Sequence, residues 1–455
     1  MNINASPHSL SGTVTVPGSK SHTIRALILA SLAEGTTRIK NPLPSADCRS
    51  TADAIPLIGA EVRFLKDEWI VKGAGRNIHL PQDVVNVGNS GSLLYFLAPI
   101  AATQKGWSVF TGDESIRRRP ADHLADVLGQ LGAEAHIARP GQRGCPLLIR
   151  GPITNRNTVR TPGSVSSQYI TGLMMASLLM PGTLRIELSD PKETPYLTMT
   201  KVWLERYGAR VKISNDFRHI EVTAPSELRA FDTTIPSDWE GVAFPVIAAL
   251  LSKDSRITIN NIDGSGTQGD DAIVEILNSV GAGIKWDKDS GTLEVSGSRR
   301  LSTESLPGAE LHINISGFPD AVCALAVAAC FTEGKTVIED AAMCRKKETD
   351  RLSVLVSELT KLGASISADE DSLTICGHSP YLKDGGVNAE FSMHGGTVES
   401  YGDHRMAMSL ACLALGLNDG QRVTVKDAEC CAVSFPDFFT TMNSLGAGFE
   451  LPEQK

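Results

Sequence analysis

One short stretch near the start of the chain combines a cation, a hydroxyl and a guanidinium just ahead of an apolar run. Lys20, Ser21 and Arg25 follow a Gly-Ser turn, and residues 26–30 are all apolar. This pattern predicts a helix whose free N–H groups and dipole favour an anion at its first turn. We therefore expect a phosphate or carboxylate to bind here. A charged first turn on a core helix is the structural alternative.

The same design recurs at five later points, where Gly, Ser, Asn or Asp precedes an apolar run. These starts are residues 88–92, 164–168, 237–238, 317–320 and 402–405. Each start taken alone is explained by N-capping, because short polar side chains satisfy the first free N–H groups of a helix. Six buried helices that directed such starts toward a common centre would form a strong anion site.

Two further stretches are dense in charge. In residues 115–120 we interpret Arg117 and Arg118 as a solvated basic turn, and Arg119 as a ligand candidate because it stands next to a helix start. In residues 344–351, Lys347 and Arg351 are four positions apart and would share one helix face. Glu348 between these cations should stay ionised, although a salt-bridged helix start would have the same composition.

A Gly-Ala dipeptide organises the elements that must position these groups. Six copies recur at a near-constant spacing of 73 to 83 residues, beginning at Gly59, Gly132, Gly208, Gly281, Gly363 and Gly446. Each copy follows an amphipathic stretch, and most lead into an alternating one, which predicts a helix, a glycine stop and a strand. We infer six structural repeats, each a strand–helix–strand–helix–strand–strand unit whose first helix is buried. A boundary near residues 224–235 would leave three repeats on each side.

Composition narrows the class of protein. A chain of 455 residues should contain two or three domains, and its net charge of −9 disfavours a nucleic-acid or anionic-membrane partner. The nine cysteines include no C-x-x-C pair or metal-ligand spacing, so we expect reduced thiols in a cytoplasmic protein. The N-terminus lacks a targeting pattern, and the most apolar window, residues 172–180, is too short to cross a bilayer.

Taken together, these motifs resemble the enolpyruvyl transferases over nearly the whole chain. The matching motifs are at residues 17–25, 88–91, 118–120, 164–168, 268–270, 347–351, 403–408 and 434–437. The resemblance implies an α/β protein, the two-domain inverse α/β barrel of this family, with six repeats and three in each domain. It also implies that residues 17–235 form the first domain, that residues 1–16 plus 236–455 form the second, and that the active site lies in the cleft between them.

Within this family, the motifs are most similar to those of the branch that acts on shikimate 3-phosphate. That similarity implies transfer of the enolpyruvyl group of phosphoenolpyruvate to the 5-hydroxyl of shikimate 3-phosphate. The reaction releases phosphate by addition and elimination through a tetrahedral intermediate. It is a step of the shikimate pathway to chorismate and the aromatic amino acids. The resemblance makes Asp320 the base for the hydroxyl, while Glu348 and Lys20 handle the proton at the methylene carbon.

The resemblance also implies two sets of binding residues and no cofactor or metal. The residues for phosphoenolpyruvate are Lys20, Gly91, Arg119, Gln168, Arg351, His404 and Arg405. Those for shikimate 3-phosphate are Lys20, Ser21, Arg25, Ser166, Ser167, Gln168, Tyr196, Asp320 and Lys347. We expect a monomer whose partners are these two small molecules.

Two other functions stay open. The first is a sister transferase with another hydroxyl acceptor, such as UDP-N-acetylglucosamine. That branch typically has a cysteine in a loop for which residues 111–119 here contain none, and an Asn where this chain has Ser21. The second is a non-catalytic relative that only binds anions, which the presence of Asp320, Glu348 and Lys20 disfavours.

Four positions depart from the pattern of the family. Tyr95 replaces a common Arg, Met343 a frequent Asn, and Val433 a Lys at the phosphoenolpyruvate end. Glu193 stands where a Ser near the acceptor phosphate is usual. A carboxylate that faced the phosphate would repel it, whereas one that pointed away would have little effect on the acceptor.

Overall fold

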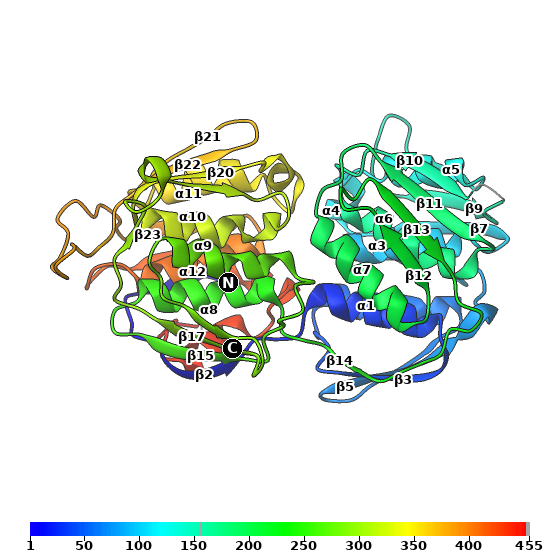
Figure 1. Ribbon diagram of the computed structural model, residues 1–455, viewed down its shortest axis with the longest axis horizontal. Helices are drawn as coiled ribbons and strands as arrows, with labels where there is room; N and C mark the ends of the chain where they lie inside the picture. The colour runs from blue at the N-terminus through cyan, green and yellow to red at the C-terminus, as the bar shows by residue number, and fades with distance from the viewer. Residues whose placement is uncertain (155–156, 452–455) are drawn as a thin grey trace. The chain divides into compact units, whose positions relative to one another are not determined.

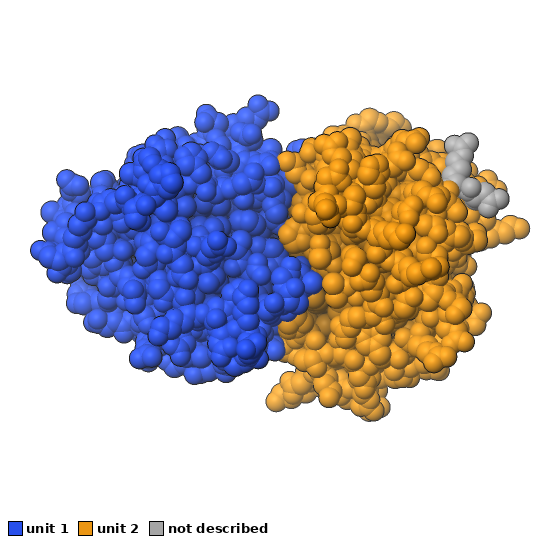
Figure 2. Space-filling model, in the orientation of Figure 1, with its two compact units in different colours: residues 1–17, 237–455 blue, residues 18–236 orange. Residues whose placement is uncertain are grey.

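The computed structural model describes residues 1–154 and 157–451 of the chain. The chain divides into two compact units, coloured separately in Figure 2. Unit 1 comprises Met1–Pro17 and Ser237–Lys455, and unit 2 comprises Gly18–Pro236. Among the described residues, each helix is too short or too polar to cross a membrane.

The described residues of unit 2 form three four-stranded sheets. Their strand orders are β14-β3-β5-β4, β6-β7-β9-β8 and β10-β11-β13-β12. In each sheet the first pair is parallel and the other two pairs are antiparallel. The strands are β3 (Glu34–Lys40), β4 (Glu61–Phe64), β5 (Glu68–Ala74), β6 (Val85–Asn86), β7 (Gly106–Thr111), β8 (Glu134–Ile137), β9 (Leu147–Gly151), β10 (Thr158–Thr161), β11 (Thr183–Leu188), β12 (Arg210–Ile213), β13 (His219–Thr223) and β14 (Thr233–Thr234).

Three helices of unit 2 are buried on nearly all faces, and the others are partly exposed. The buried helices are α1 (Lys20–Ser31), α3 (Gly91–Ala101) and α6 (Ser167–Ala176). The others are α2 (Ala46–Ala54), α4 (Glu114–Arg118), α5 (Asp122–Gln130) and α7 (Thr194–Arg206). Helices α3 and α6 approach closely at Gly172, where an added Cβ would lie 1.9 Å from the carbonyl oxygen of Tyr95. Only glycine fits this crossing, which places the first turns of two predicted site helices in a fixed register.

Unit 1 takes two strands from the N-terminal segment of the chain. Strand β2 (Ser11–Thr15) runs parallel to β15, and β1 (Ile3–Ala5) runs antiparallel to β24. The sheet orders are β16-β17-β15-β2, β18-β20-β22-β21 with β19 also on β20, and β1-β24-β23. The remaining strands are β15 (Arg256–Asn260), β16 (Lys285–Asp287), β17 (Thr292–Ser296), β18 (Leu301–Ser302), β19 (Glu310–Asn314), β20 (Thr332–Glu339), β21 (Ser365–Ala368), β22 (Leu373–Gly377), β23 (Gly396–Glu399) and β24 (Val423–Lys426).

Three apolar helices form the interior of unit 1, and Figure 1 shows them between the sheet of β20–β22 and the sheet of β2, β15 and β17. They are α8 (Trp239–Leu251), α10 (Val322–Cys330) and α12 (His404–Leu415). The outer helices are α9 (Ala272–Ser279), α11 (Arg351–Thr360) and α13 (Phe438–Ser444). The prediction of six buried helices is thereby confirmed, because each is built almost wholly from buried residues.

The Gly-Ala signal is also confirmed as a helix stop. All six glycines that begin the dipeptide have a left-handed backbone, with φ between 85° and 105°. The sixth repeat departs from the predicted order. After α13 the described residues, which end at 451, form only a single bridge, between Asn4 and Glu450, and β24 pairs with β1. The residues of β1 and β24 that pair are about 420 positions apart, so no local sequence signal marks the pairing and the repeat pattern could not predict it.

Candidate active site

Three cations of unit 1 converge on the carboxylate of Asp320, which lies in the short helix Pro319–Ala321 that leads into α10. Lys347 Nζ is 3.3 Å from its Oδ2. Arg351 Nη1 is 2.6 Å and Arg405 Nε 3.1 Å from its Oδ1. The predicted base and three predicted binding residues therefore meet at one point, although they come from three separate parts of the chain.

Arg351 links this point to two more carboxylates. It is the first residue of α11 and its side chain is fully buried. Nη2 donates to Glu348 Oε2 at 2.7 Å, and Nε donates to Asp403 Oδ2 at 2.8 Å. Asp403 is the N-cap of α12, and its other oxygen accepts from the backbone N–H of Arg405. One guanidinium thus holds both predicted proton-transfer carboxylates beside the start of a buried helix.

The predicted shared helix face of Lys347 and Arg351 is wrong. Helix α11 begins only at Arg351, because Asp350 caps it by accepting from the backbone N–H of Ser353. Lys347 precedes the cap with an extended backbone, at the end of the short helix Ala342–Lys346. The two cations still meet, but they do so through Asp320 and not through helical spacing.

The charges of this cluster set its protonation. Burial alone would raise the pKa of Asp320, but the positive charges of Lys347, Arg405 and Arg351 hold it well below its ordinary value. Asp320 is therefore ionised and able to accept a proton. Burial together with the negative charges of Glu240 and Asp320 has the opposite effect on Asp270, whose pKa is raised well above its ordinary value.

Two predicted site residues open helix α12. His404 and Arg405 are its first two residues, and both are buried. The guanidinium of Arg405 forms an ion pair with Glu240, at the start of α8, as well as with Asp320. Burial lowers the pKa of Arg405, but Glu240 and Asp320 outweigh that effect and raise it. The starts of α8, α10 and α12 are therefore joined by one chain of ion pairs.

In unit 2, Gly91 at the start of α3 lies beside two other predicted residues, Gln168 and Arg119. A Cβ added at Gly91 would lie 3.4 Å from Gln168 Oε1 and 3.5 Å from Arg119 Nη1. Gln168 Nε2 donates to Ser92 Oγ at 3.1 Å, and Arg119 Nη2 donates to Asn89 Oδ1 at 3.3 Å. The main chain at the start of α3, where Gly91 has no side chain, thus meets an amide and a guanidinium, a set of groups able to bind a phosphate or carboxylate.

Helix α1 provides two more predicted site residues of unit 2, the cations Lys20 and Arg25. Lys20 Nζ is 3.4 Å from Asp47 Oδ2, on α2. Arg25 is buried, and it donates to the main-chain oxygens of Ser21 and Tyr196 and to the hydroxyl of Thr200. Both side chains are therefore held in place by neighbouring helices of unit 2.

The predicted acceptor serines lie at the start of α6. Ser166 is the N-cap and its Oγ accepts from the backbone N–H of Gln168. Glu193 Oε2 accepts from the backbone N–H of Ser167 at 3.0 Å, and also from the hydroxyls of Ser167 and Ser166. Of the two orientations that the sequence left open, the structure shows the carboxylate facing these serines.

Sequence reasoning missed four residues that contact predicted site residues. Asp403 and Glu240 hold site arginines, Asp47 pairs with Lys20, and Thr200 accepts from Arg25. Asp403 stood in a quoted motif, but N-capping already explained it. Asp47 lies in the first turn of α2, whose N-cap is Ser45. Glu240 and Thr200 carried no local signal.

The other departures from the family pattern have ordinary surroundings. Tyr95 is buried in α3, and its hydroxyl donates to the main-chain oxygen of Pro120 at 2.7 Å. Met343 lies in the short helix Ala342–Lys346, and Val433 ends the short helix Ala428–Val433.

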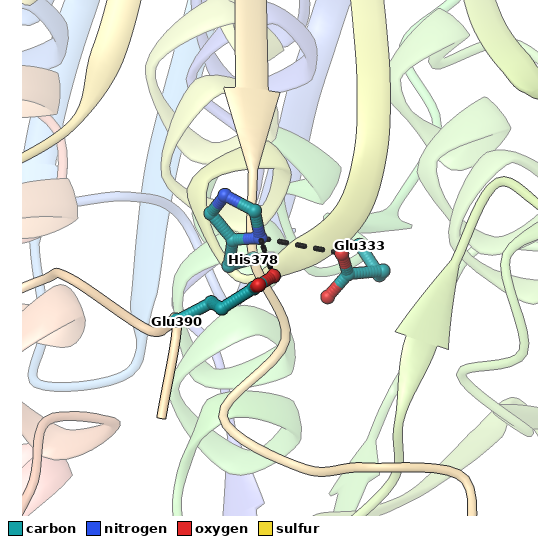
Figure 3. Close-up of side chains that lie close together, drawn as sticks. All are labelled: Glu333, His378 and Glu390. Carbon is teal, nitrogen blue, oxygen red and sulfur yellow. Dashed lines mark hydrogen bonds and ion pairs between the residues drawn. The ribbon is translucent and has the colours of Figure 1, made fainter. Parts of the chain in front are cut away.

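A separate His–carboxylate cluster of unit 1 has groups that could ligate a metal. Glu333, His378 and Glu390 each place one ligand atom within 4.8 Å of the others (Figure 3). Glu333 also accepts from the backbone N–H of Ser379 at 3.2 Å and from Asn388 Nδ2 at 3.3 Å. We interpret the cluster as an anchor that ties residues 378–390 to the start of β20.

Residues 5–442 match the family model of EPSP synthase (3-phosphoshikimate 1-carboxyvinyltransferase). The chain is 36% identical over 451 residues to the 3-phosphoshikimate 1-carboxyvinyltransferase of Ruminiclostridium cellulolyticum, which covers 99% of this chain and 100% of the relative. It is 37% identical over 437 residues to the protein of the same name from Acetivibrio thermocellus, which covers 96% of each.

Solved structures agree in fold. EPSP synthase from Acinetobacter baumannii has a TM-score of 0.83 at 26% identity, over 99% of this chain and all of that one. The enolpyruvyl transferase NikO from Streptomyces tendae has a TM-score of 0.77 at 18% identity, over 99% of this chain and 98% of its own. The predicted inverse α/β barrel fold is thereby confirmed. From the family match and the full-length relatives, the chain belongs to the EPSP synthase (3-phosphoshikimate 1-carboxyvinyltransferase) family.

Proposed function

We propose that this protein transfers the enolpyruvyl group of phosphoenolpyruvate to the 5-hydroxyl of shikimate 3-phosphate and releases phosphate, as a step of the shikimate pathway. The observation that carries the proposal is the meeting of Lys347, Arg351 and Arg405 on Asp320. This meeting places an ionised base among cations suited to anionic substrates, in a chain that matches the family along nearly its whole length.

The residues form two groups according to the substrate they would bind, and Lys20 and Gln168 belong to both groups. We assign Lys20, Gly91, Arg119, Gln168, Arg351, His404 and Arg405 to phosphoenolpyruvate. We assign Lys20, Ser21, Arg25, Ser166, Ser167, Gln168, Tyr196, Asp320 and Lys347 to shikimate 3-phosphate. The first group combines guanidinium and ammonium cations with the bare start of α3, and the second includes the serine N–H and hydroxyl donors at the start of α6. Both sets suit phosphate oxygens, which accept charge-assisted hydrogen bonds.

The proposed reaction has two halves. In the addition, Asp320 takes the proton of the 5-hydroxyl while its oxygen attacks C2 of phosphoenolpyruvate, and Glu348 with Lys20 delivers a proton to the methylene carbon. In the elimination, the resulting methyl group returns a proton to Glu348 with Lys20, the carbon–carbon double bond re-forms and the C–O bond to phosphate breaks. The departing phosphate takes the proton that Asp320 holds. Arg351 supports these roles by holding Asp320 and Glu348 with two nitrogens of one guanidinium.

The test is phosphate release from phosphoenolpyruvate in the presence of shikimate 3-phosphate. UDP-N-acetylglucosamine is the comparison acceptor, and a reaction without acceptor is the blank. We expect turnover with shikimate 3-phosphate alone. No release at millimolar shikimate 3-phosphate would contradict the proposal. Turnover with the sugar nucleotide would instead assign the chain to the sister activity, and binding of both substrates without turnover would make it a non-catalytic relative.

A further inference from the structure

Three hydrogen-bond donors in unit 2 converge on a single carboxylate oxygen. The backbone N–H of Ser167 lies 3.0 Å from Glu193 Oε2, the Ser167 hydroxyl 2.9 Å, and the Ser166 hydroxyl 3.3 Å. We call these three donors the serine seat. Glu193 is 5% exposed, so its carboxylate is largely removed from water and these donors help to compensate for the lost hydration. A phosphate oxygen would take the same three hydrogen bonds.

A buried arginine independently marks this part of unit 2 as a place for an anion. Arg25 is 2% exposed, and its hydrogen bonds all go to neutral oxygens, those of Ser21, Tyr196, Thr171 and Thr200. Burial lowers the pKa of Arg25 to about 10, and the charge of Glu193 is one of the influences that oppose this shift. Glu193 therefore acts electrostatically as a counter-charge for Arg25.

The serine seat is built into the fold independently of Glu193. Ser166 caps α6, and its Oγ accepts from the backbone N–H of Gln168 at 3.2 Å. Ser167 is the first residue of that buried helix, whose crossing with α3 is fixed at Gly172. Glu193, in contrast, belongs to the segment between β11 and α7. The carboxylate can leave by rotation about its side-chain bonds while the donors stay in place.

We propose that Glu193 is a resident anion of the serine seat and that an anionic acceptor must displace it to bind. Two negative charges cannot share donors that are within 3.3 Å of one oxygen, because their repulsion is strong in a partly desolvated site. Position 193 therefore sets the affinity for a phosphorylated acceptor in this chain. The inference rests on the proposed function, since that function assigns Ser166 and Ser167 to the phosphate of the acceptor.

The first test compares steady-state kinetics of the wild type with Glu193→Gln and Glu193→Ser. Gln keeps the size of the side chain and removes the charge, whereas Ser is also too short to reach the three donors of the serine seat. We expect the KM for shikimate 3-phosphate to fall about tenfold or more in both variants, as loss of a competing charge predicts. The KM for phosphoenolpyruvate should stay within about twofold. The matched control is Glu205→Gln, which removes a half-exposed carboxylate of α7 that pairs with Lys201.

The second test does not depend on turnover. Binding of inorganic phosphate is measured by calorimetry for the wild type, Glu193→Ser and the double variant Glu193→Ser with Ser167→Ala. Inorganic phosphate is also the product and has a second place to bind, so the result is the difference between variants. We expect Glu193→Ser to bind phosphate at the serine seat about tenfold more tightly than the wild type does. The double variant should lose this gain in affinity.

The outcomes separate the two proposals. Turnover with an unchanged or higher KM for shikimate 3-phosphate in both variants would overturn the role of Glu193 and leave the proposed function standing. No turnover in any protein, with a phosphate site gained only in Glu193→Ser, would overturn the proposed function and keep the serine seat. Equal phosphate binding by all three proteins would overturn the seat. If Glu193→Ser fails to fold, Glu193→Gln replaces it in both assays.

Discussion

Arg351 donates through Nη1 to Oδ1 of Asp320 at 2.6 Å, from a position that is fully buried. This contact, with those of Lys347 and Arg405, keeps Asp320, the proposed base, ionised but makes it a weak base before substrates bind. Anionic substrates that approach the same cations would offset their charge and raise the pKa of Asp320 toward a value useful for proton transfer. The cations therefore couple substrate binding to the strength of the base.

Asp320→Asn should abolish most of the activity without weakening acceptor binding. The amide cannot take the hydroxyl proton, so we expect kcat to fall by about 10²–10⁴. Removing one negative charge beside three cations should leave the affinity for shikimate 3-phosphate equal or higher. Rapid-quench kinetics and calorimetry measure the two effects. A variant that kept kcat within tenfold of the wild type would remove Asp320 as the base.

Arg351→Met should destabilise the protein by about 3–5 kcal/mol, because it strands the carboxylates of Asp320, Glu348 and Asp403 without their shared partner. Urea unfolding monitored by fluorescence gives the free energy. The control is Arg256→Met, whose side chain is 78% exposed and 4.0 Å from Glu294. That change should cost less than about 1 kcal/mol. Equal effects of the two substitutions would contradict the buried network described here.

His123 should make the protein sensitive to mild acid. Burial lowers its pKa to about 4, from 6.5 for a solvated imidazole. Above pH 6.5 the ring is neutral in both states, and below it the unfolded chain takes up a proton that the folded protein does not. Stability is therefore present above pH 6.5 and is lost as the pH falls toward 4. Between pH 6.5 and about 5 the loss should be about 2 kcal/mol.

The comparison for this prediction is His123→Phe, which keeps a ring beside Tyr169, at 4.6 Å between centroids, without a titrating group. Urea unfolding at several pH values should show a shallower loss of stability for this variant than for the wild type. The same pH dependence in both proteins would show that other groups govern stability in acid.

Gly172→Ala should be costly, because the new Cβ would lie 1.9 Å from a main-chain oxygen of α3 that cannot move aside alone. We expect a loss of about 3 kcal/mol and weaker substrate binding, since the start of α6 would shift. Gly129→Ala is the matched helix control, because among the described residues no atom outside its own stretch of helix lies within 4 Å of the added Cβ. It should raise the free energy of unfolding by about 0.5–1 kcal/mol. Thermal and urea unfolding compare the pair.

Local signals in the sequence predicted the elements well. Ser90, Ser166 and Asp403 cap their helices as such residues usually do, and the repeated glycines end helices with a left-handed backbone. These features depend on residues within a few positions of each other. The strand pairing of the sixth repeat depends instead on residues at opposite ends of the chain, and it was not predictable from the repeat pattern.

The sequence named many residues of the candidate site, but it did not predict which of them contact one another. The motifs identified Asp320, Lys347 and Arg351, but the spacing suggested a helix face where the structure has a shared carboxylate. Whether Glu193 faced Ser167 depended on how α7 packs beside α6, across 26 positions of sequence. Asp47 and Glu240 hold cations through contacts of the same long-range kind. Such contacts follow from packing, which local composition does not encode.

Strands β1 and β2 have a consequence for the order of events during synthesis. Both are synthesised before unit 2, yet their partners β24 and β15 lie more than 240 residues later in the chain. Unit 2 is continuous, and all its sheet partners lie between residues 18 and 236. It can therefore fold while the rest of the chain is still being made, whereas the N-terminal strands must wait, unpaired, for most of translation.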